Sequence, residues 1–503
     1  MKRNRKGWFL GIDIGTGSCK TVVADENFTI LGFSTAHYGG EDSRTKWLEQ
    51  NLVDIFSATV KASIQAIEMA NVEKRKCIAV SLGGALHTFL AIDGKGNPLI
   101  PAITWADTRA GTQAKRYRLS EEGLELYKRT GCPPHPMYPL YKLLWLKENE
   151  LDIFRRADKF ISVKEYVFSR LVGEYAVDYS LASGSSLFNV ITLDWDELAL
   201  ELVGIPRSKL SNVCKPTEIF YFSNKEIADK IGIPHHTLLI LGSSDAVNSS
   251  LGAGAFNPYQ ATCMVGTSGA LRVLYDEPIL DVKMRTWCYA IEPGKWLIGG
   301  AINNGGIILE WLKEILGINS TDYLLSLAEN SNIGAKGLIC LPFFAGERSP
   351  NWNFNAKASL VGLTLEHTRE DIARSFVESI AFRLKSVQNA LIELIPEVKE
   401  IRVSGGLTHS TLWIEILANV LGKEILVPQW KDTSAPGASL WAMKGANHFE
   451  KFTDIVSHIR TEKNLLPDPK KNQIYEQIFK LYEKLYARLS PIFDELHAYQ
   501  FIS

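Results

Sequence analysis

The apolar positions of this chain fall into two kinds of run. Residues 8–14 are mostly apolar, and after a glycine-containing turn residues 21–24 are apolar again. Short runs bounded by glycine are typical of buried strands, so this start predicts a strand, a tight turn and a second strand. From residue 47 to residue 70 the apolar residues recur every three or four positions, which predicts a helix. The alternation continues with predicted strands at 77–82, 89–92 and 102–105 and predicted helices at 140–148, 160–171 and 194–202. Strands that alternate with helices indicate an α/β domain with a mixed sheet.

The second half of the chain begins in the same way as the first. An apolar strand at 238–241 leads into Gly242-Ser243-Ser244-Asp245, and residues 262–273 again read as strand, glycine turn and strand. Two such hairpins about 250 residues apart predict a structural duplication with one domain per copy, 1–246 and 247–503. The later pattern predicts a helix at 369–394, a strand at 401–404, a helix at 410–421 and a last helix at 474–489 that packs on the second domain.

Composition narrows the class of protein. With 503 residues, 46% of them hydrophobic, the chain is long enough for two cores. A net charge of -1 and a pI near 6.8 give no electrostatic reason to expect a nucleic acid or an anionic membrane as partner. No apolar run reaches the ~20 residues needed to span a bilayer. The basic start is not expected to be a signal peptide, since Asp13 interrupts its apolar stretch.

The cysteines point to a reducing compartment. All seven are scattered, odd in number and without a C-x-x-C pair, which predicts free thiols, a cytoplasmic protein and no zinc site. Cys19 lies beside the first glycine turn, where we interpret it as a small buried filler rather than a reactive nucleophile.

The first glycine turn has the composition of a phosphate-binding loop. Gly15 and Gly17 allow a close backbone approach, Thr16 and Ser18 add hydroxyl groups, and Lys20 adds a positive charge. Asp13 would repel a bare phosphate, so it makes sense there through a bound Mg²⁺. The glycines alone would also fit an ordinary turn. The loop is not a Walker motif, because no G-x-x-x-x-G-K-[ST] occurs in the chain.

Several motifs together resemble the FGGY carbohydrate kinases, from about residue 8 to residue 450. They are GIDIGTGSCK, MYPLYKLLWLKEN, GSSDAV, VGTSGALRV, GERSPNWN and an SGG turn. Softer features (TWADTRA, YKRTGCPPHPMYP, VDYSLASG and LDWD) resemble the gluconate kinases more than the glycerol or xylulose kinases. Phe376 departs from the family pattern, which usually has a smaller residue there. The resemblance implies two duplicated actin-like (ribonuclease H-like) α/β domains, with ATP and Mg²⁺ bound in an active-site cleft between them.

The resemblance also implies roles for individual residues. Asp245 would be the catalytic base that accepts the proton of the attacking sugar hydroxyl, and Asp13 and Asp245 would hold the metal. Without the resemblance, Asp245 would also fit a helix N-cap. The residues implied for ATP and phosphate are Gly15, Thr16, Gly17, Ser18, Lys20, Gly266, Thr267, Gly306, Gly405, Gly406 and Ser410.

The acceptor pocket is expected between the domains, and side chains that both donate and accept hydrogen bonds suit a polyol. The candidates are His87, Trp105, Asp107, Arg109, Arg272, Asn303 and Asn304, with Glu347 as a further one. Each has a simpler interpretation: His87 as a core histidine, Asn303-Asn304 as a turn, Glu347-Arg348 as a surface ion pair. Arg109 or Arg272 is expected to bind the carboxylate that distinguishes gluconate from a ketose.

The function expected from the resemblance is ATP-dependent phosphorylation of D-gluconate to 6-phospho-D-gluconate. The partner is then a small sugar or sugar acid, with no nucleic acid and no membrane. A xylulokinase or another FGGY sugar kinase is the nearest alternative. A non-catalytic nucleotide-binding sensor is the alternative of another class, although Asp13, Thr16, Thr267 and Asp245 together argue against it. A homodimer is compatible with the sequence, since dimers are common among such kinases.

Overall fold

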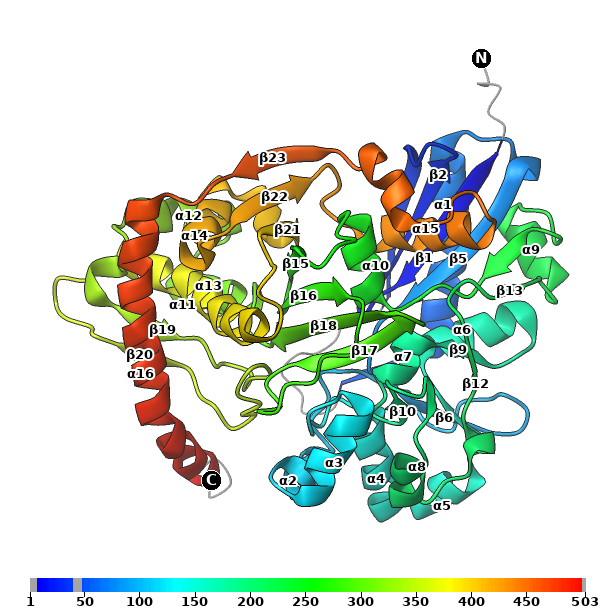
Figure 1. Ribbon diagram of the computed structural model, residues 1–503, viewed down its shortest axis with the longest axis horizontal. Coiled ribbons are helices and arrows are strands. Elements are labelled where there is room, and N and C mark those ends of the chain that lie inside the picture. Colours follow the sequence, from blue (N-terminus) through cyan, green and yellow to red (C-terminus); the bar gives the residue numbers. More distant parts are fainter. Residues whose placement is uncertain (1–6, 39–47, 500–503) are drawn as a thin grey trace.

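The computed structural model describes residues 7–38 and 48–499, which contain two mixed sheets (Figure 1). In the first sheet, β1 (Trp8–Ile14), β2 (Ser18–Asp25) and β3 (Ile30–His37) form an antiparallel meander. β5 (Cys77–Gly84) and β14 (Leu238–Ile240) continue the sheet in parallel, and β13 (Ile219–Phe220) ends it antiparallel. The first predicted hairpin is therefore confirmed as β1 and β2.

The second sheet repeats this order. β15 (Gln260–Val265), β16 (Gly269–Tyr275) and β18 (Lys295–Ile302) form the meander, and β21 (Glu400–Gly405) and β22 (Glu424–Pro428) the parallel pair. β23 (Thr461–Leu465) is the antiparallel edge, and β17 (Trp287–Glu292) is one strand more than the first sheet has. Equivalent strands in equivalent order confirm the predicted duplication and the α/β class.

Helices cover both sheets. α1 (Leu52–Ala70) packs on β2 and β3, and its N-cap is Asn51, whose side chain accepts from the Val53 amide. The predicted start at residue 47 lies outside the described residues. The second sheet is covered by α13 (Arg369–Leu394), predicted with these bounds, and by α14 (Thr411–Leu421). α11 (Ile307–Leu316) and α12 (Thr321–Glu329) pack on α13.

α1 begins after β4 (Glu49–Gln50), so the predicted helix is wrong for the described residues before Leu52. Two further helices predicted from periodicity begin later than expected. In the range 160–171 the first residues form β8 (Lys159–Ile161), and α6 (Val163–Val172) begins after Ser162, which makes a capping box with Glu165. In the range 194–202, β11 (Asp194–Trp195) precedes α8 (Glu197–Val203), which Asp196 caps. In both places a capping side chain sets the start, because it satisfies the free amides of the first turn.

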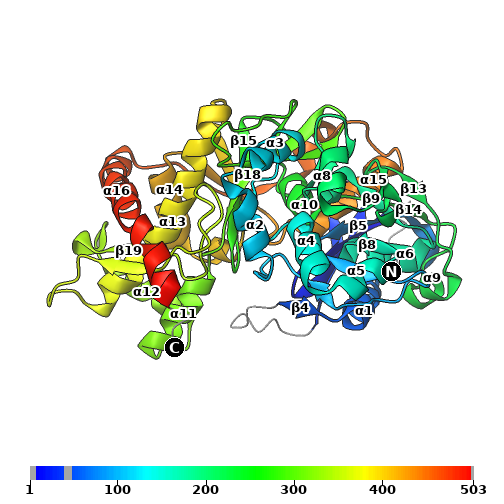
Figure 2. The same ribbon diagram turned by 90° about the horizontal axis from the view of Figure 1, so that it is seen from below.

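Residues 85–237 form a lobe between β5 and β14. Its further elements are β6 (Leu90–Ile92), β7 (Ala102–Ile103), α2 (Gly111–Arg118), α3 (Glu121–Thr130), α4 (Pro139–Asn149), α5 (Leu151–Arg156), β9 (Ala176–Asp178), α7 (Tyr179–Ser183), β10 (Phe188–Asn189), β12 (Asn212–Cys214) and α9 (Lys225–Ile231). The lobe meets the second sheet at its edge strand β17 (Figures 1 and 2). The Cys288 amide donates to the Gly131 carbonyl at 2.9 Å, and the Ala290 amide donates to the Ser183 hydroxyl at 3.0 Å. A segment of the first half thus covers the open edge of the second sheet.

The halves also meet through α10 (Asp245–Gly252) and α15 (Ser434–Gly445), which follow the equivalent strands β14 and β22. Although α15 belongs to the second half, it lies on the first sheet as well, against β1 and β5. Glycines make the contact close: a Cβ on Gly437 would lie 1.8 Å from the Asn248 carbonyl oxygen, and one on Gly11 would lie 2.4 Å from that of Ala435. The two halves therefore interlock rather than merely touch.

Gly437→Ala is expected to lower the free energy of unfolding by about 3 kcal/mol, because the added methyl would force α15 away from α10. Gly94→Ala is the matched control, since a Cβ there meets nothing within 4 Å and its φ is not positive. Chemical denaturation of both variants measures the difference. Equal stability of the two variants would mean that the helix contact can relax at little cost.

The last helix, α16 (Pro469–Tyr499), packs on the helices of the second half as predicted. The hydroxyl of Tyr475 donates to Glu378 at 2.9 Å and accepts from Arg374 at 2.8 Å. All seven cysteines are free. Burial of Cys19 raises its pKa to about 12, which agrees with a filler rather than a nucleophile. Within residues 7–38 and 48–499, no helix combines the length and the apolar character needed to cross a bilayer.

Candidate active site

Two carboxylates, one buried and one half-buried, lie where the central strands of the first sheet end. Asp13 is near the carboxyl end of β1, and Asp245 begins α10 just after β14. Oδ1 of Asp245 accepts from the Ala246 amide at 2.7 Å and from the Leu86 amide at 3.3 Å. The N-cap of α10 is Ser244, whose hydroxyl accepts from the Val247 amide. The simpler interpretation of Asp245 as the helix N-cap is therefore wrong. Oδ1 makes both of these hydrogen bonds, which leaves Oδ2 to accept from a ligand.

Asp13 is held in an unfavourable setting for a carboxylate. Burial, together with the nearby charges of Asp245 and Asp432, raises its pKa to about 7. Oδ2 accepts from the Ser434 hydroxyl at 2.6 Å, while Oδ1 has no hydrogen-bond partner among the described residues. Burial also raises the pKa of Asp245, against the opposing effect of Arg272. Crowded carboxylates with an unsatisfied oxygen fit a hard divalent cation such as Mg²⁺, which binds oxygen ligands.

The first glycine turn, residues 15–18, joins β1 to β2 beside Asp13. The Gly15 amide donates to the Ser18 carbonyl at 3.0 Å, and a side chain at Gly17 would meet nothing within 4 Å, so this side of the turn is open. Thr16 accepts from the indole N–H of Trp105 at 3.3 Å. Lys20 forms an ion pair with Asp432, from the loop before α15. The turn is thereby tied to both halves of the chain.

The second glycine turn, residues 266–269, joins β15 to β16. The Gly266 amide donates to the Ser268 carbonyl at 2.9 Å, and Gly306 supports the turn by donating to the Gly266 carbonyl at 2.7 Å. Thr267 lines a cleft of about 640 Å³, the larger cleft. Both predicted turns thus exist and are open enough to receive a ligand.

Of the other residues predicted to bind ATP and phosphate, Gly405 ends β21 and Gly406 follows it. Gly405 has a φ of +88°, and a Cβ there would lie 2.5 Å from the Val265 carbonyl oxygen, so only glycine fits. Ser410 caps α14, because its hydroxyl accepts from the Trp413 amide at 3.2 Å. The hydrogen bond of the Ser410 side chain thus stabilises the start of α14.

A small pocket of about 90 Å³ opens beside Asp245, and several predicted acceptor residues meet there. Its polar and aromatic wall consists of His87, Trp105, Asp245, Ser268, Arg272, Trp287, Tyr289 and Arg348. His87 both lines this pocket and is satisfied in the core, since Nδ1 lies 2.7 Å from the Gly184 carbonyl oxygen. Burial lowers the pKa of His87 to about 3, so its ring is neutral at physiological pH.

Two buried arginines line this pocket, and the nearest carboxylates act on them only through space: Asp245 on Arg272 and Glu347 on Arg348. Arg272, on β16, donates to the Ala246 carbonyl at 3.0 Å, and Arg348 donates to the Ile302 carbonyl at 2.9 Å. Nε of each lacks a partner, and neither forms an ion pair within the part of the chain that the structure describes. Burial lowers the pKa of both guanidinium groups, that of Arg348 to about 10. Arg348 also lies over the Trp105 ring, 4.6 Å from its centre.

Arg348 was not among the predicted site residues, and its simpler interpretation as half of a surface ion pair is wrong. Arg348 is buried, and the buried Glu347 pairs instead with Arg383 at 3.2 Å and accepts from the Asn303 amide at 2.8 Å. The GERSP motif was the signal in the sequence that could have identified Arg348 as a site residue. Which of its two charges faces a pocket depends on Arg383, 36 positions away in the sequence.

The remaining acceptor candidates lie elsewhere. Asp107, Arg109 and Asn303 line a larger cleft of about 640 Å³, together with Trp105 and Thr267, and Asp107 and Arg109 do not line the small pocket. Arg109 is engaged by Asp107, with Nε at 2.9 Å from Oδ1 and Nη2 at 2.8 Å from Oδ2, and by Glu49 at 2.7 Å.

Asn304 is buried and uses its amide inside the protein. Nδ2 donates to the Gly346 carbonyl at 2.7 Å, and Oδ1 accepts from the Ala345 amide at 3.0 Å. Its side chain therefore fixes residues 345–346, which is more than the plain turn of the simpler interpretation.

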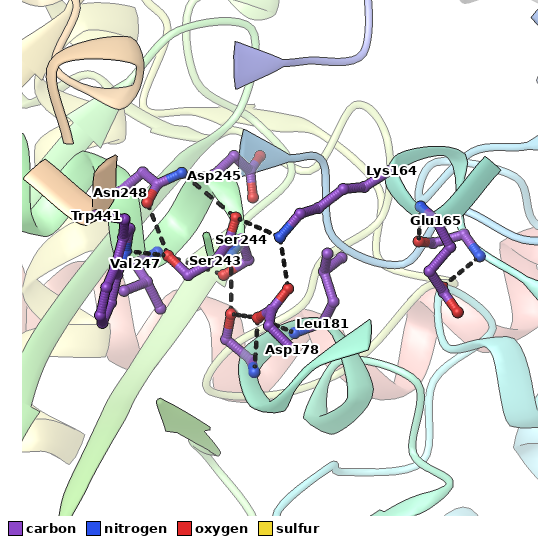
Figure 3. A network of polar contacts seen from close by, with 12 residues as sticks. Lys164, Glu165, Asp178, Leu181, Ser243, Ser244, Asp245, Val247, Asn248 and Trp441 are labelled. Atoms are coloured by element: carbon purple, nitrogen blue, oxygen red, sulfur yellow. Dashed lines mark hydrogen bonds and ion pairs between the residues drawn. The ribbon is translucent and has the colours of Figure 1, made fainter. Parts of the chain in front are cut away.

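The turn that carries Asp245 is tied to α15. Trp441 donates its indole N–H to the Ser243 hydroxyl at 2.7 Å, and that hydroxyl donates to Asn248 at 2.7 Å (Figure 3). At its first residue, Ser434, the same helix binds Asp13. One helix of the second half thus contacts the surroundings of both carboxylates.

Known proteins resemble this chain both in sequence and in structure. The model of the FGGY family of carbohydrate kinases, N-terminal domain, matches residues 8–252, and that of the C-terminal domain matches residues 261–446. A gluconokinase of Bacillus subtilis (strain 168) is 35% identical over 505 residues, which cover 98% of each chain. The structure of gluconate kinase from Lactobacillus acidophilus superposes with a TM-score of 0.91, at 29% identity, over 97% of this chain and 99% of that one. Ligand-bound xylulose kinase from Lactobacillus acidophilus gives 0.92, at 29% identity, over 97% and 100%.

Proposed function

The chain belongs to the FGGY family of carbohydrate kinases, and from this premise we propose that it phosphorylates D-gluconate on its terminal hydroxyl, with ATP as donor and 6-phospho-D-gluconate as product. The observation that carries the choice of acceptor is the pair Arg272 and Arg348, buried beside the single carboxylate of Asp245, each with an unpartnered Nε and neither in an ion pair among the described residues. A buried charge is costly unless it is paired, so this pocket favours an anionic ligand. A sugar acid supplies the missing carboxylate.

In the proposed complex the acceptor chain lies in the small pocket, with its carboxylate toward the arginines and its terminal hydroxyl toward Asp245. Asp245 accepts the proton of that hydroxyl as its oxygen attacks the γ-phosphate. The neutral His87 can exchange hydrogen bonds with the polyol, and Trp105 offers an apolar face to its C–H groups.

The two glycine turns would hold the phosphates from opposite sides by their amides and hydroxyls, with Lys20 and Thr267 as the side chains best placed to help. Asp13 and Asp245 would hold Mg²⁺, which neutralises charge on the transferring phosphate when bound. We propose that each half, 1–246 and 247–503, contributes one turn. Most of the rate gain then comes from holding the reactants in line and out of water.

A xylulokinase is the second candidate, because the xylulose kinase of Lactobacillus acidophilus superposes as well as the gluconate kinase does. A neutral ketose would leave both arginines unpaired in a buried pocket, which argues against it. The deciding experiment is release of ADP from Mg²⁺-ATP with gluconate, xylulose, glycerol, ribulose, fuculose and rhamnulose. The proposal requires the highest kcat/KM for gluconate. A ketose in first place would overturn the acceptor, and ATP binding without sugar-stimulated turnover would favour a sensor.

Arg272→Gln is expected to lower kcat/KM for gluconate by about 10- to 100-fold, since a charge-assisted hydrogen bond contributes roughly 1.5–3 kcal/mol. Any residual turnover of xylulose should change little, so the ratio of the two efficiencies is the measurement. Arg109→Gln separates the two arginines predicted from sequence. A loss of gluconate preference in Arg109→Gln, with none in Arg272→Gln, would place the carboxylate of the substrate in the larger cleft.

A further inference from the structure

A buried ion pair lies behind the turn that carries Asp245. Nζ of Lys164, on α6, is 2.7 Å from Oδ2 of Asp178, at the end of β9, and both side chains are 2% exposed or less. Neither residue lines the small pocket or the larger cleft. Burying two charges costs about as much as their attraction returns, so stability alone is a weak reason for this pair.

The other oxygen of Asp178 organises the start of α7. Oδ1 accepts from the Ser180 amide at 3.0 Å, from the Ser180 hydroxyl at 2.5 Å and from the Leu181 amide at 3.2 Å. These bonds fix the rotamer of Ser180, because its hydroxyl donates to a charged acceptor. The oxygen of that hydroxyl is then free to accept a hydrogen bond from the turn before Asp245.

The network holds both polar ends of one peptide group. The Ser244 amide donates to the Ser180 hydroxyl at 2.8 Å. The carbonyl of the same peptide group, on Ser243, accepts from Lys164 at 3.4 Å and from Asn248 at 3.3 Å. A peptide group held at both ends cannot rotate freely, and Asp245 is the residue that follows Ser244.

We propose that Ser180, oriented by the Lys164–Asp178 pair, is a positioning residue that sets the direction in which Asp245 faces the acceptor hydroxyl. The inference rests on the proposed function to the extent that Asp245 is the base. Proton transfer needs the carboxylate within hydrogen-bond reach of the hydroxyl, and a displacement of about 1 Å costs up to 100-fold in rate. Ser180 touches neither substrate nor nucleotide in this arrangement.

The test compares two serines of one helix. Ser180→Ala removes the bond to the Ser244 amide, whereas the control Ser183→Ala removes an equally buried hydroxyl that accepts from the Ala290 amide on β17. Both variants should lose similar thermal stability. Ser180→Ala should lower kcat by about 10-fold or more, with KM for ATP and for the acceptor within 2-fold of the wild type. Ser183→Ala should keep kcat within 2-fold.

Ser180→Cys supplies a graded second variant, since a thiol is a weak donor and acceptor. Its kcat is expected between those of the wild type and Ser180→Ala. Equal kcat in Ser180→Ala and Ser183→Ala, or a loss that lies in KM, would overturn the positioning role. All variants are measured with the acceptor that the wild type uses best, so a wrong choice of gluconate leaves this test valid. A wild type without sugar-dependent turnover would overturn both proposals together.

Discussion

Asp245→Asn is expected to lower kcat by about 10²–10⁴-fold, the usual contribution of a positioned general base. Asparagine has nearly the shape of aspartate, and its carbonyl oxygen can still accept from the Ala246 and Leu86 amides. What it cannot do is take up the proton of the attacking hydroxyl. The measurement is acceptor-dependent release of ADP at saturating Mg²⁺-ATP and sugar.

The control for this variant is binding. Affinity for ATP measured without Mg²⁺, the ion that Asp245 is proposed to help hold, should stay close to that of the wild type, because the hydrogen bonds that hold residue 245 remain. Retention of more than a tenth of the wild-type kcat would assign the base to another group. Asp13 would then be the next candidate, since its pKa is raised to about 7.

Asp13→Asn is expected to have two opposite effects. Turnover should fall by at least 100-fold, because the proposed metal ligand loses its charge. Stability should rise, because the wild-type protein buries a carboxylate whose pKa moves from 3.8 to about 7 on folding. In the unfolded chain this carboxyl loses its proton near pH 4, and in the folded protein only near pH 7. Its ionisation therefore costs folding free energy that grows between those values and is complete above pH 7.

The difference between these pKa values corresponds to about 4 kcal/mol as an upper bound. Melting temperatures of the wild type and Asp13→Asn, measured in EDTA from pH 5 to pH 8, test the sign. The gap in favour of the variant should widen as the pH rises and level off above pH 7. A gap that stays constant with pH would mean that Asp13 is not protonated in the metal-free protein.

The parts of the fold that were predicted correctly depend on local pattern. The hairpins of both halves and the helix 369–394 follow from glycine turns and apolar spacing, which nearby residues decide. The late starts of α6 and α8 came from caps at Ser162 and Asp196, a signal that was present in the sequence and was overlooked. Strand β17 and its cover by the lobe could not be predicted, because they depend on contacts between residues more than 100 positions apart.

The residues of the candidate site also differ in whether local sequence was enough to predict them. Residues within or next to a recognisable turn, such as Thr16, Thr267 and Asp245, were named from the sequence and lie at the two turns and the pocket. Charged residues were harder, because their role depends on which partner the fold supplies. Arg109 forms ion pairs with Asp107 and Glu49, whereas Arg348 forms none among the described residues and lines the pocket. Asp432 was not predicted at all, and its place beside Lys20 and Asp13 comes from the crossing of α15 onto the first sheet.

The covered edge of β17 bears on how the protein is made. The chain leaves the ribosome amino end first, so Gly131 and Ser183 are in place long before Cys288 and Ala290 emerge to bind them. A nascent β17 can therefore be paired on both sides as soon as its own sheet begins to form. Synthesised without the first half, the same strand would present unpaired amides to other chains, the usual route to edge-to-edge aggregation. Residues that are synthesised early thus cover the edge of a sheet that is completed later.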